Sequence, residues 1–142
     1  MTVRDVLERK GSDIWSIAPD ASVYDAIELM ADKGIGALLV TEGERLCGIV
    51  SERDYARKVV LKGRSSSDTQ VKDIMTARVL YVGRERSIEE CMALMTEKRV
   101  RHLPVMEDDR LIGILSVGDV IKAIISKQEF IIEQLEDYIK GR

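Results

Sequence analysis

Two serine–aspartate pairs of identical spacing are the residues of this chain best suited to bind a ligand. Ser51 precedes Asp54 by three positions, and Ser116 precedes Asp119 in the same way. Each serine directly follows an apolar run typical of a buried strand. A helix that begins there presents free N–H groups and its dipole to an anion, and an aspartate one turn later can accept two hydrogen bonds from a vicinal diol. With Arg53 suited to phosphate, these residues match the needs of a ribose phosphate.

The same spacing also has a purely structural interpretation. Ser-x-x-Asp before an apolar helix is a capping box, and the chain carries similar signals at Ser22-Val23-Tyr24-Asp25 and Ser87-Ile88-Glu89-Glu90. On spacing alone, capping is the more common explanation. The position directly after a buried strand favours a ligand, because open α/β sheets bind ligands at the carboxyl ends of their strands. Both interpretations stay open at this point.

The elements that must position these residues occur twice. Residues 14–56 align with residues 79–121 at a constant shift of 65 and without a gap, with Gly48/Gly113, Ser51/Ser116 and Asp54/Asp119 among the identical pairs. Two like units in one short chain predict a pseudo-twofold pair with a cleft between its halves. We therefore expect the binding site in that cleft.

Each repeat is predicted to have the order β-α-β-β-α. In the first we expect strand 14–17, helix 22–33, strand 37–40, turn 42–44, strand 46–50 and helix 51–61. In the second we expect strand 79–82, helix 87–98, strand 102–106, turn 107–110 and strand 111–115, and short helices at 3–10 and 71–75 open the two repeats. Strands 37–40 and 46–50 are apolar without alternation, so both their faces must be covered. One unit is too small to do this alone, which predicts an α/β (α+β) fold of two units packed together.

The predicted boundaries are unit one at residues 1–62, a linker at 63–70, unit two at 71–126 and a helical tail at 127–142. The last helix is expected to run from Val117 to Tyr138, and only its first half has a counterpart in repeat one. Its apolar face must be covered by the chain's own body or by a partner chain. We favour a partner and hence a homodimer. The apolar residues of this face are Ile121, Ile124, Ile125, Ile132, Leu135 and Ile139.

Composition excludes several functions. The net charge of −3 does not favour nucleic acid or an anionic membrane, and no apolar run is long enough to span a bilayer. The polar start lacks the core of a signal peptide, so we expect a cytoplasmic protein. We find no nucleophile with a paired base, no metal cluster and no GxxxxGK loop, which argues against an enzyme. Cys47 and Cys91 are interpreted as buried thiols, and Trp15 either flanks a pocket or fills the core.

Several motifs in order resemble a known family. Gly48-Ile49-Val50-Ser51-Glu52-Arg53-Asp54 and Gly113-Ile114-Leu115-Ser116-Val117-Gly118-Asp119 resemble the Gly-h-h-Ser/Thr-x-x-Asp signature of CBS domains, and so do residues 71–76 and 101–105 in their places. The resemblance covers residues 3–126. It implies a tandem pair, often called a Bateman module, with two pseudosymmetric clefts that bind AMP, ADP, ATP, NAD(H) or S-adenosylmethionine. Such pairs typically dimerise into a flat disc of four units.

The resemblance also implies roles for single residues. Asp54 and Asp119 match the aspartate that binds ribose, and Ser51 and Ser116 match the hydroxyl on the phosphate side. The remaining matches are Arg53, Arg101 and His102 for phosphate, Thr69 and Val71 for the adenine pocket, and Arg64 with Ser65–Ser67 for a terminal phosphate.

Two departures from the pattern predict unequal clefts. Gly118 stands where the first signature has Arg53, and Gly36-Ala37 stands where repeat two has Arg101-His102.

The resemblance and the absence of catalytic motifs together lead us to expect a non-catalytic sensor of an adenine nucleotide, with no metal, no catalytic cofactor and an unidentified effector protein as partner. Two alternatives stay open: a structural dimerisation or partner-binding module with vestigial clefts, and a hydrolase or transferase that acts on the bound nucleotide.

Overall fold

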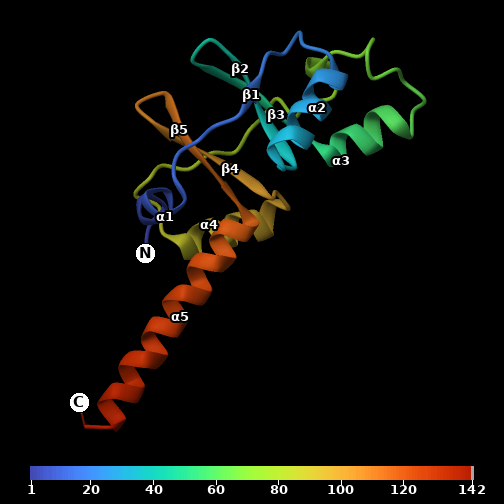
Figure 1. Cartoon of the computed structure of the whole chain (residues 1–142). Coiled ribbons are helices and arrows are strands. Elements are labelled where there is room, and N and C mark those ends of the chain that lie inside the picture. Colours follow the sequence, from blue (N-terminus) through green and yellow to red (C-terminus); the bar gives the residue numbers. More distant parts are fainter. Residues whose placement is uncertain (142) are drawn as a thin grey trace. The chain divides into compact units, whose positions relative to one another are not determined.

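The computed structural model describes residues 1–141 and confirms a mixed helix and strand fold (Figure 1). In chain order, the elements are α1 (Val3–Lys10), β1 (Ser16–Ile17), α2 (Val23–Lys33), β2 (Ala37–Glu42), β3 (Arg45–Ser51), α3 (Glu52–Tyr55), a π-helix (Ala56–Val60), a 3₁₀-helix (Val71–Asp73), α4 (Ile88–Lys98), β4 (His102–Glu107), β5 (Arg110–Ser116) and α5 (Val117–Ile139). No helix among these residues is long and apolar enough to cross a membrane.

The chain forms two compact units that do not follow the order of the sequence. One unit contains residues 13–80 and 108–112, and the other contains residues 1–12, 81–107 and the chain from 113 onward. Helix α1 thus belongs with the second repeat, and the segment after the linker belongs with the first.

The unit of residues 13–80 is built on a three-stranded sheet. Strand β1 pairs with β2 in parallel, and β2 pairs with β3 in antiparallel register, with Leu38 opposite Val50. All four residues of 37–40 are buried, as the absence of alternation predicted. Helix α2 begins at Ser22, whose hydroxyl accepts a hydrogen bond from the Asp25 N–H, and it packs Val23, Ala26 and Met30 into the core.

The other unit contains β4, the part of β5 from Gly113 onward and the helices α1, α4 and α5. Its buried side chains include Leu103, Val105 and Leu115 from the strands and Ile88 and Cys91 from α4. Helix α4 packs against the first part of α5, and Figure 1 shows the second part of α5 extending beyond α4.

Three predicted elements differ in kind from the structure, and the strand expected over 14–17 is shortened to Ser16–Ile17. The helix expected over 51–61 is α-helical only to Tyr55 and then widens, with Leu61 N–H bonded to the Ala56 carbonyl. The helix expected over 71–75 is a 3₁₀-helix of three residues. The strand expected over 79–82 is reduced to one bridge between Val82 and Val105.

A proline explains the missing strand. In repeat one, the Leu39 N–H donates to the carbonyl of Trp15, which helps hold β1 on β2. The residue at the same place in repeat two is Pro104, which has no N–H to donate. Only the flanking bonds remain there, from Val82 N–H to the Pro104 carbonyl and from Met106 N–H to the Val82 carbonyl.

One of the predictions for the two cysteines needs correction, and the structure decides between the two alternatives for Trp15. Cys91 is buried as expected, and burial raises its thiol pKa to about 11. Cys47 is only partly buried, because it lies on the less covered side of β3. Trp15, for which the sequence left a pocket or the core open, does not fill the core: the residue is 42% exposed, and the Lys33 ammonium lies 4.1 Å from the ring centroid.

A glycine in each repeat lets another segment approach the strand that leads to the serine–aspartate pair. A Cβ on Gly48 would lie 2.7 Å from the Thr76 carbonyl oxygen, and a Cβ on Gly113 would lie 2.8 Å from a methyl of Leu7. These contacts bring the 75–76 segment against β3 and the end of α1 against β5. The segment that opens each predicted repeat therefore lies beside the serine–aspartate pair of the other repeat.

Candidate functional site

Both serine–aspartate pairs form capping boxes at the junction of a strand and a helix. In the first, Asp54 Oδ2 accepts from the Ser51 N–H at 2.9 Å and from its hydroxyl at 3.0 Å, and Ser51 Oγ accepts from the Asp54 N–H. In the second, Asp119 Oδ2 accepts from the Ser116 N–H at 2.8 Å, and Ser116 Oγ accepts from the Asp119 N–H at 3.1 Å. The capping interpretation therefore holds at both places. It fixes each carboxylate through one oxygen and does not exclude a ligand on the other.

The residues around Asp54 form what we call the Asp54 cluster: Ser51, Arg53, Asp54, Tyr55 and Lys58. Lys58 donates to the Ile74 carbonyl at 2.8 Å and lies 3.2 Å from Asp54 Oδ1. Arg53 is exposed and has no ion pair within residues 1–141. The cluster thus offers one free cation beside a fixed carboxylate.

The linker residues expected near the adenine are held by structural contacts. Thr69 is buried, and its hydroxyl donates to the Ser65 carbonyl at 2.6 Å. The Val71 side chain is fully buried in the core. Arg64 lies 3.9 Å from Asp73. A ligand contact from any of the three stays a prediction.

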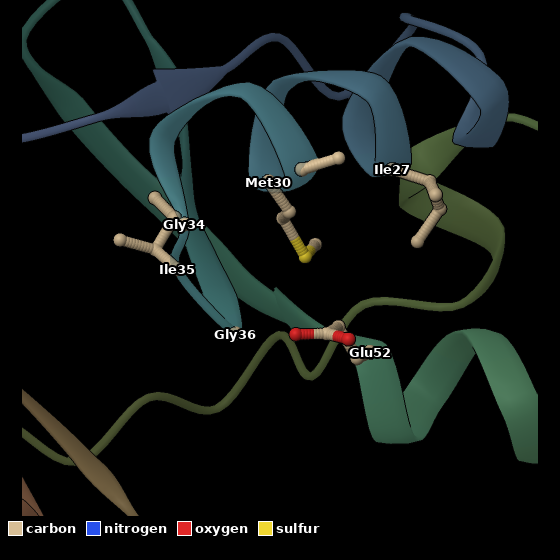
Figure 2. Close-up of a pocket in the computed structure, with 7 residues that line it drawn as sticks. Ile27, Met30, Gly34, Ile35, Gly36 and Glu52 are labelled. Carbon is tan, nitrogen blue, oxygen red and sulfur yellow. The ribbon is translucent and has the colours of Figure 1, made fainter.

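A cavity of about 290 Å³ lies between the end of α2 and the start of α3. Figure 2 shows the Met30 thioether reaching into it and the Glu52 carboxylate extending toward Gly36. The side chains that line it are apolar apart from this carboxylate, which has no ion pair within the part of the chain that the structure describes. Its remaining lining residues are Ile27, Ala31, Gly34 and Ile35.

The repeat gives this place opposite charges in its two copies. The counterparts of Gly36 and Glu52 are Arg101 and Val117, and the local backbone is the same: Glu52 N–H donates to the Gly36 carbonyl at 3.0 Å, and Val117 N–H donates to the Arg101 carbonyl at 2.8 Å. Repeat one therefore carries an acidic residue at the second of these positions and no charge at the first, whereas repeat two carries a basic residue at the first and no charge at the second. The sequence showed the loss of Arg101-His102 in repeat one but not the role of Glu52.

The residues around Asp119 form the Asp119 cluster: Lys10, Arg101, His102, Ser116 and Asp119. Lys10 Nζ lies 2.7 Å from Asp119 Oδ2 and donates to the Ile114 carbonyl at 2.8 Å. Sequence reasoning missed this lysine, because it lies 109 positions before Asp119 in the chain. The second signature has Gly118 in place of the arginine at Arg53, and Lys10 of α1 supplies a positive charge there instead.

Electrostatics in this cluster favour a charged Asp119 and a neutral His102. Burial would raise the pKa of the Asp119 carboxyl, but the bonds from Lys10 and the Ser116 N–H outweigh it and leave the pKa below its usual value. Burial lowers the pKa of His102; nearby Asp119 opposes this, and Lys10 and Arg101 add to it. At neutral pH, His102 can therefore offer a phosphate a hydrogen bond but no full charge.

We expect the imidazole of His102 to titrate below pH 6.5 in the folded protein. It is the only histidine, so one NMR resonance followed from pH 8 to pH 4.5 reports it directly. Because Lys10 lowers and Asp119 raises its pKa, Lys10→Gln is expected to raise the value and Asp119→Asn to lower it. The urea-unfolded chain, which titrates near 6.5, is the control. A folded pKa above 6.5 would contradict the described surroundings of the ring.

The sign of this shift sets the pH dependence of stability. Between the folded pKa of His102 and about 6.5, the unfolded chain binds more protons than the folded one. The contribution of His102 is thus complete above pH 6.5 and is lost as the pH falls through the folded pKa. The pKa of Asp119 is also lowered in the folded protein, so its contribution to stability is likewise lost on acidification, at a pH below about 4.

Within residues 1–141, no group of three or more His, Cys, Asp or Glu side chains is placed to hold a metal ion. A second cavity lies beside the end of β4, lined by arginines and glutamates. Its arginines Arg84 and Arg86 pair with Glu107 and Glu90, so an anion there would have to displace a carboxylate.

Comparison with known proteins agrees with these features. The chain is 39% identical to the CBS domain-containing protein CBSX3, mitochondrial, of Arabidopsis thaliana, over 99% of this chain and 72% of that protein. A solved structure of a protein with CBS domains from Burkholderia ambifaria is 55% identical, has a TM-score of 0.87 and covers 90% of this chain and 96% of its own.

A more distant structure shares the fold. The CBS domain pair of protein MJ0100, solved with 5′-methylthioadenosine and S-adenosyl-L-methionine, has a TM-score of 0.79 at 21% identity and covers 89% of this chain and 98% of its own. Residues 2–61 and residues 71–126 each match the family described as CBS domain. The chain therefore belongs to the CBS domain family and carries two CBS domains in tandem.

Proposed function

We propose that the chain is a non-catalytic regulatory protein that binds an adenine nucleotide: AMP, ADP, ATP or NAD. Asp54 and Asp119 would accept hydrogen bonds from the ribose hydroxyls. Ser51 and Ser116 would lie on the phosphate side, with Arg53, Arg101 and His102 as further phosphate contacts. The adenosine part is supported by MJ0100, whose domain pair was solved with two adenosine compounds.

One observation carries the proposal: each signature aspartate is held in place by its own backbone and lies near a cation. Asp54 Oδ2 is occupied by Ser51, whereas Asp119 Oδ2 is occupied by Ser116 and Lys10. A fixed carboxylate binds a diol with little loss of side-chain entropy, since its rotamer is already set. Capping and ligand binding are therefore compatible roles of one side chain.

The charges around the two clusters favour different ligands. The Asp119 cluster has Lys10 and Arg101 and suits a ligand with several negative charges. The Asp54 cluster has Arg53 and Lys58, but Glu52 lines the neighbouring cavity, and its carboxylate disfavours an anion there and favours a neutral or cationic group. This supports the prediction that the two sites differ in affinity.

A regulatory effect requires a ligand that binds two states of the protein differently. We propose that nucleotide binding changes the arrangement of the CBS pair or of its dimer and so changes its contact with an effector protein. The cytoplasmic location expected from the sequence stays part of this proposal.

Thermal unfolding with added ligands tests the proposal. A ligand at one hundred times its Kd adds about 2.7 kcal/mol to the free energy of unfolding, or roughly 8 °C in Tm for a chain of this length. We expect a shift with at least one of AMP, ADP, ATP and NAD, with S-adenosylmethionine as the cationic comparison and inorganic phosphate as the control. No shift with any adenine compound would contradict the proposal and favour the structural module with vestigial clefts.

Product analysis after long incubation addresses the enzymatic alternative. We expect the nucleotide to be recovered intact. Turnover that is abolished in Asp54→Ala would contradict the non-catalytic assignment.

A further inference from the structure

An exposed apolar stripe runs along most of helix α5. Its positions follow each other at alternating spacings of four and three residues: Ile121, Ile125, Gln128, Ile132, Leu135 and Ile139. The five apolar members are between 45% and 80% exposed. The face that packs inward is a different one, marked by the buried Val120 and Ala123.

The spacing of the stripe is that of a coiled-coil seam. Alternation of four and three gives a period of 3.5 residues, which keeps one line of side chains facing a partner helix. At about 1.5 Å per residue, the helix is roughly 34 Å long, enough for several layers of contact. Only Gln128 interrupts the apolar positions, and a single polar residue in a seam is a common way to fix register.

The two flanks of the stripe differ in character. One flank carries the charged residues Lys122, Glu129 and Glu136, which have no ion pair within residues 1–141. The other flank carries Ile124, Ile131 and Tyr138. In an antiparallel pair of identical helices, like flanks face each other, whereas in a parallel pair each flank faces the opposite one.

Only the antiparallel pair matches these flanks. It places the apolar flank of one copy against the apolar flank of the other. It also places Lys122 of each copy near Glu136 of the other, which gives two attractive pairs against one repulsion between the central Glu129 residues. A parallel pair would put charged side chains against Ile124 and Ile131 and would form no ion pair.

We propose that α5 of two copies of this chain pair antiparallel along the stripe, with Lys122 of each copy opposite Glu136 of the other. The surface continues from the part of α5 that packs on α4 into the part that extends beyond it (Figure 1). Each extending tail therefore covers Ile121 and Ile125 of the other copy. This names the surface and the orientation of the homodimer that the sequence predicts.

Sedimentation equilibrium of the full chain tests the surface with a pair of neighbouring variants. Leu135→Glu puts a charge into the seam and is expected to weaken association at least 100-fold. Gln134→Glu adds the same charge on the outer face of the helix and is expected to change association less than threefold. Both positions are exposed, so circular dichroism should show an unchanged fold. A monomeric wild-type chain, or a Leu135→Glu variant that stays dimeric, would overturn the proposal.

A charge exchange tests the orientation. Lys122→Glu alone and Glu136→Lys alone each turn two attractions into repulsions, which is expected to weaken the dimer roughly tenfold. The double variant restores the opposite pairing and is expected to return close to wild type, with the difference shrinking at high salt. If the double variant dimerises as weakly as the sum of the two single losses predicts, the antiparallel arrangement is wrong. Nucleotide binding is not needed for either experiment, so failure here is distinct from failure of the proposed function.

Discussion

Replacing Gly48 by alanine is expected to lower the free energy of unfolding by about 3 kcal/mol. The new Cβ would lie 2.7 Å from the Thr76 carbonyl oxygen and 2.8 Å from the Met75 sulfur. Thr76 cannot withdraw freely, because its N–H and carbonyl both bond to Ile49, at 2.9 and 3.0 Å. The substitution therefore combines overpacking, which typically costs about 1–3 kcal/mol, with the loss of hydrogen bonds worth roughly 0.5–1.5 kcal/mol each.

The same substitution at the equivalent glycine of repeat two is expected to cost about 1 kcal/mol, at the low end of overpacking. At Gly113 the nearest atoms are the two methyl carbons of Leu7, at 2.8 and 3.1 Å. They form the end of a flexible and partly exposed side chain, so a rotamer change can relieve the contact. The two glycines occupy the same place in the repeat, but we expect their replacement to lower stability by different amounts. Gly48 faces the backbone of Thr76, whereas Gly113 faces the movable side chain of Leu7.

Urea unfolding of both variants measures the difference. Gly118→Ala is the control, since its nearest contact would be an ordinary 3.6 Å to the Ser116 hydroxyl and alanine favours a helix by about 0.5–1 kcal/mol. We expect the order Gly118→Ala, wild type, Gly113→Ala, Gly48→Ala from most to least stable. Equal losses at positions 48 and 113 would show that the Thr76 backbone is not the constraint.

The fold could be predicted from the sequence because the repeat supplies two copies of each signal. Apolar runs without alternation predicted buried strands at 37–40, where all four residues are buried, and at 46–50, where only Gly48 and Val50 are fully buried. Serines three residues before an acidic side chain predicted the starts of α2 and α4. The sequence also contains the reason why no strand forms at 79–82. Pro104 stands in repeat two where repeat one has Leu39, and proline lacks the N–H that Leu39 donates to the first strand. Its effect depends on register, which periodicity alone does not give.

The candidate site was only partly predictable. The signature residues and their capping bonds follow from local spacing, since all partners lie within three positions of each other. Lys10 reaches Asp119 across 109 positions of the chain, and the contact depends on α1 grouping with the second repeat rather than with the first. No local pattern carries that information. The Glu52 carboxylate was named within the signature, but its place at a cavity with Met30 required the fold.

Asp54→Asn is expected to weaken AMP binding roughly 10- to 100-fold if the first repeat holds the nucleotide. The loss of one charged hydrogen bond costs about 1.5–3 kcal/mol. The amide oxygen can still accept from the Ser51 N–H, so the capping box at the start of α3 is kept, whereas Asp54→Ala also removes this reciprocal hydrogen bond, which is worth about 0.5–1.5 kcal/mol. Asparagine therefore separates the ligand contact from the structural one.

Asp119→Asn is the matched variant in the second repeat. Isothermal titration with AMP and urea unfolding, made on both variants, assign the site: a loss of affinity in one variant alone identifies the repeat that binds the ribose. Lys10 of α1 lies 2.7 Å from Asp119, whereas Lys58 lies 3.2 Å from Asp54 as a partly exposed i,i+4 pair, a type worth only about 0.3–0.5 kcal/mol. We therefore expect the larger loss of stability at Asp119. If both variants bind AMP with unchanged Kd and only their stability falls, each signature aspartate is a helix cap and nothing more, and the nucleotide contact must come from other residues.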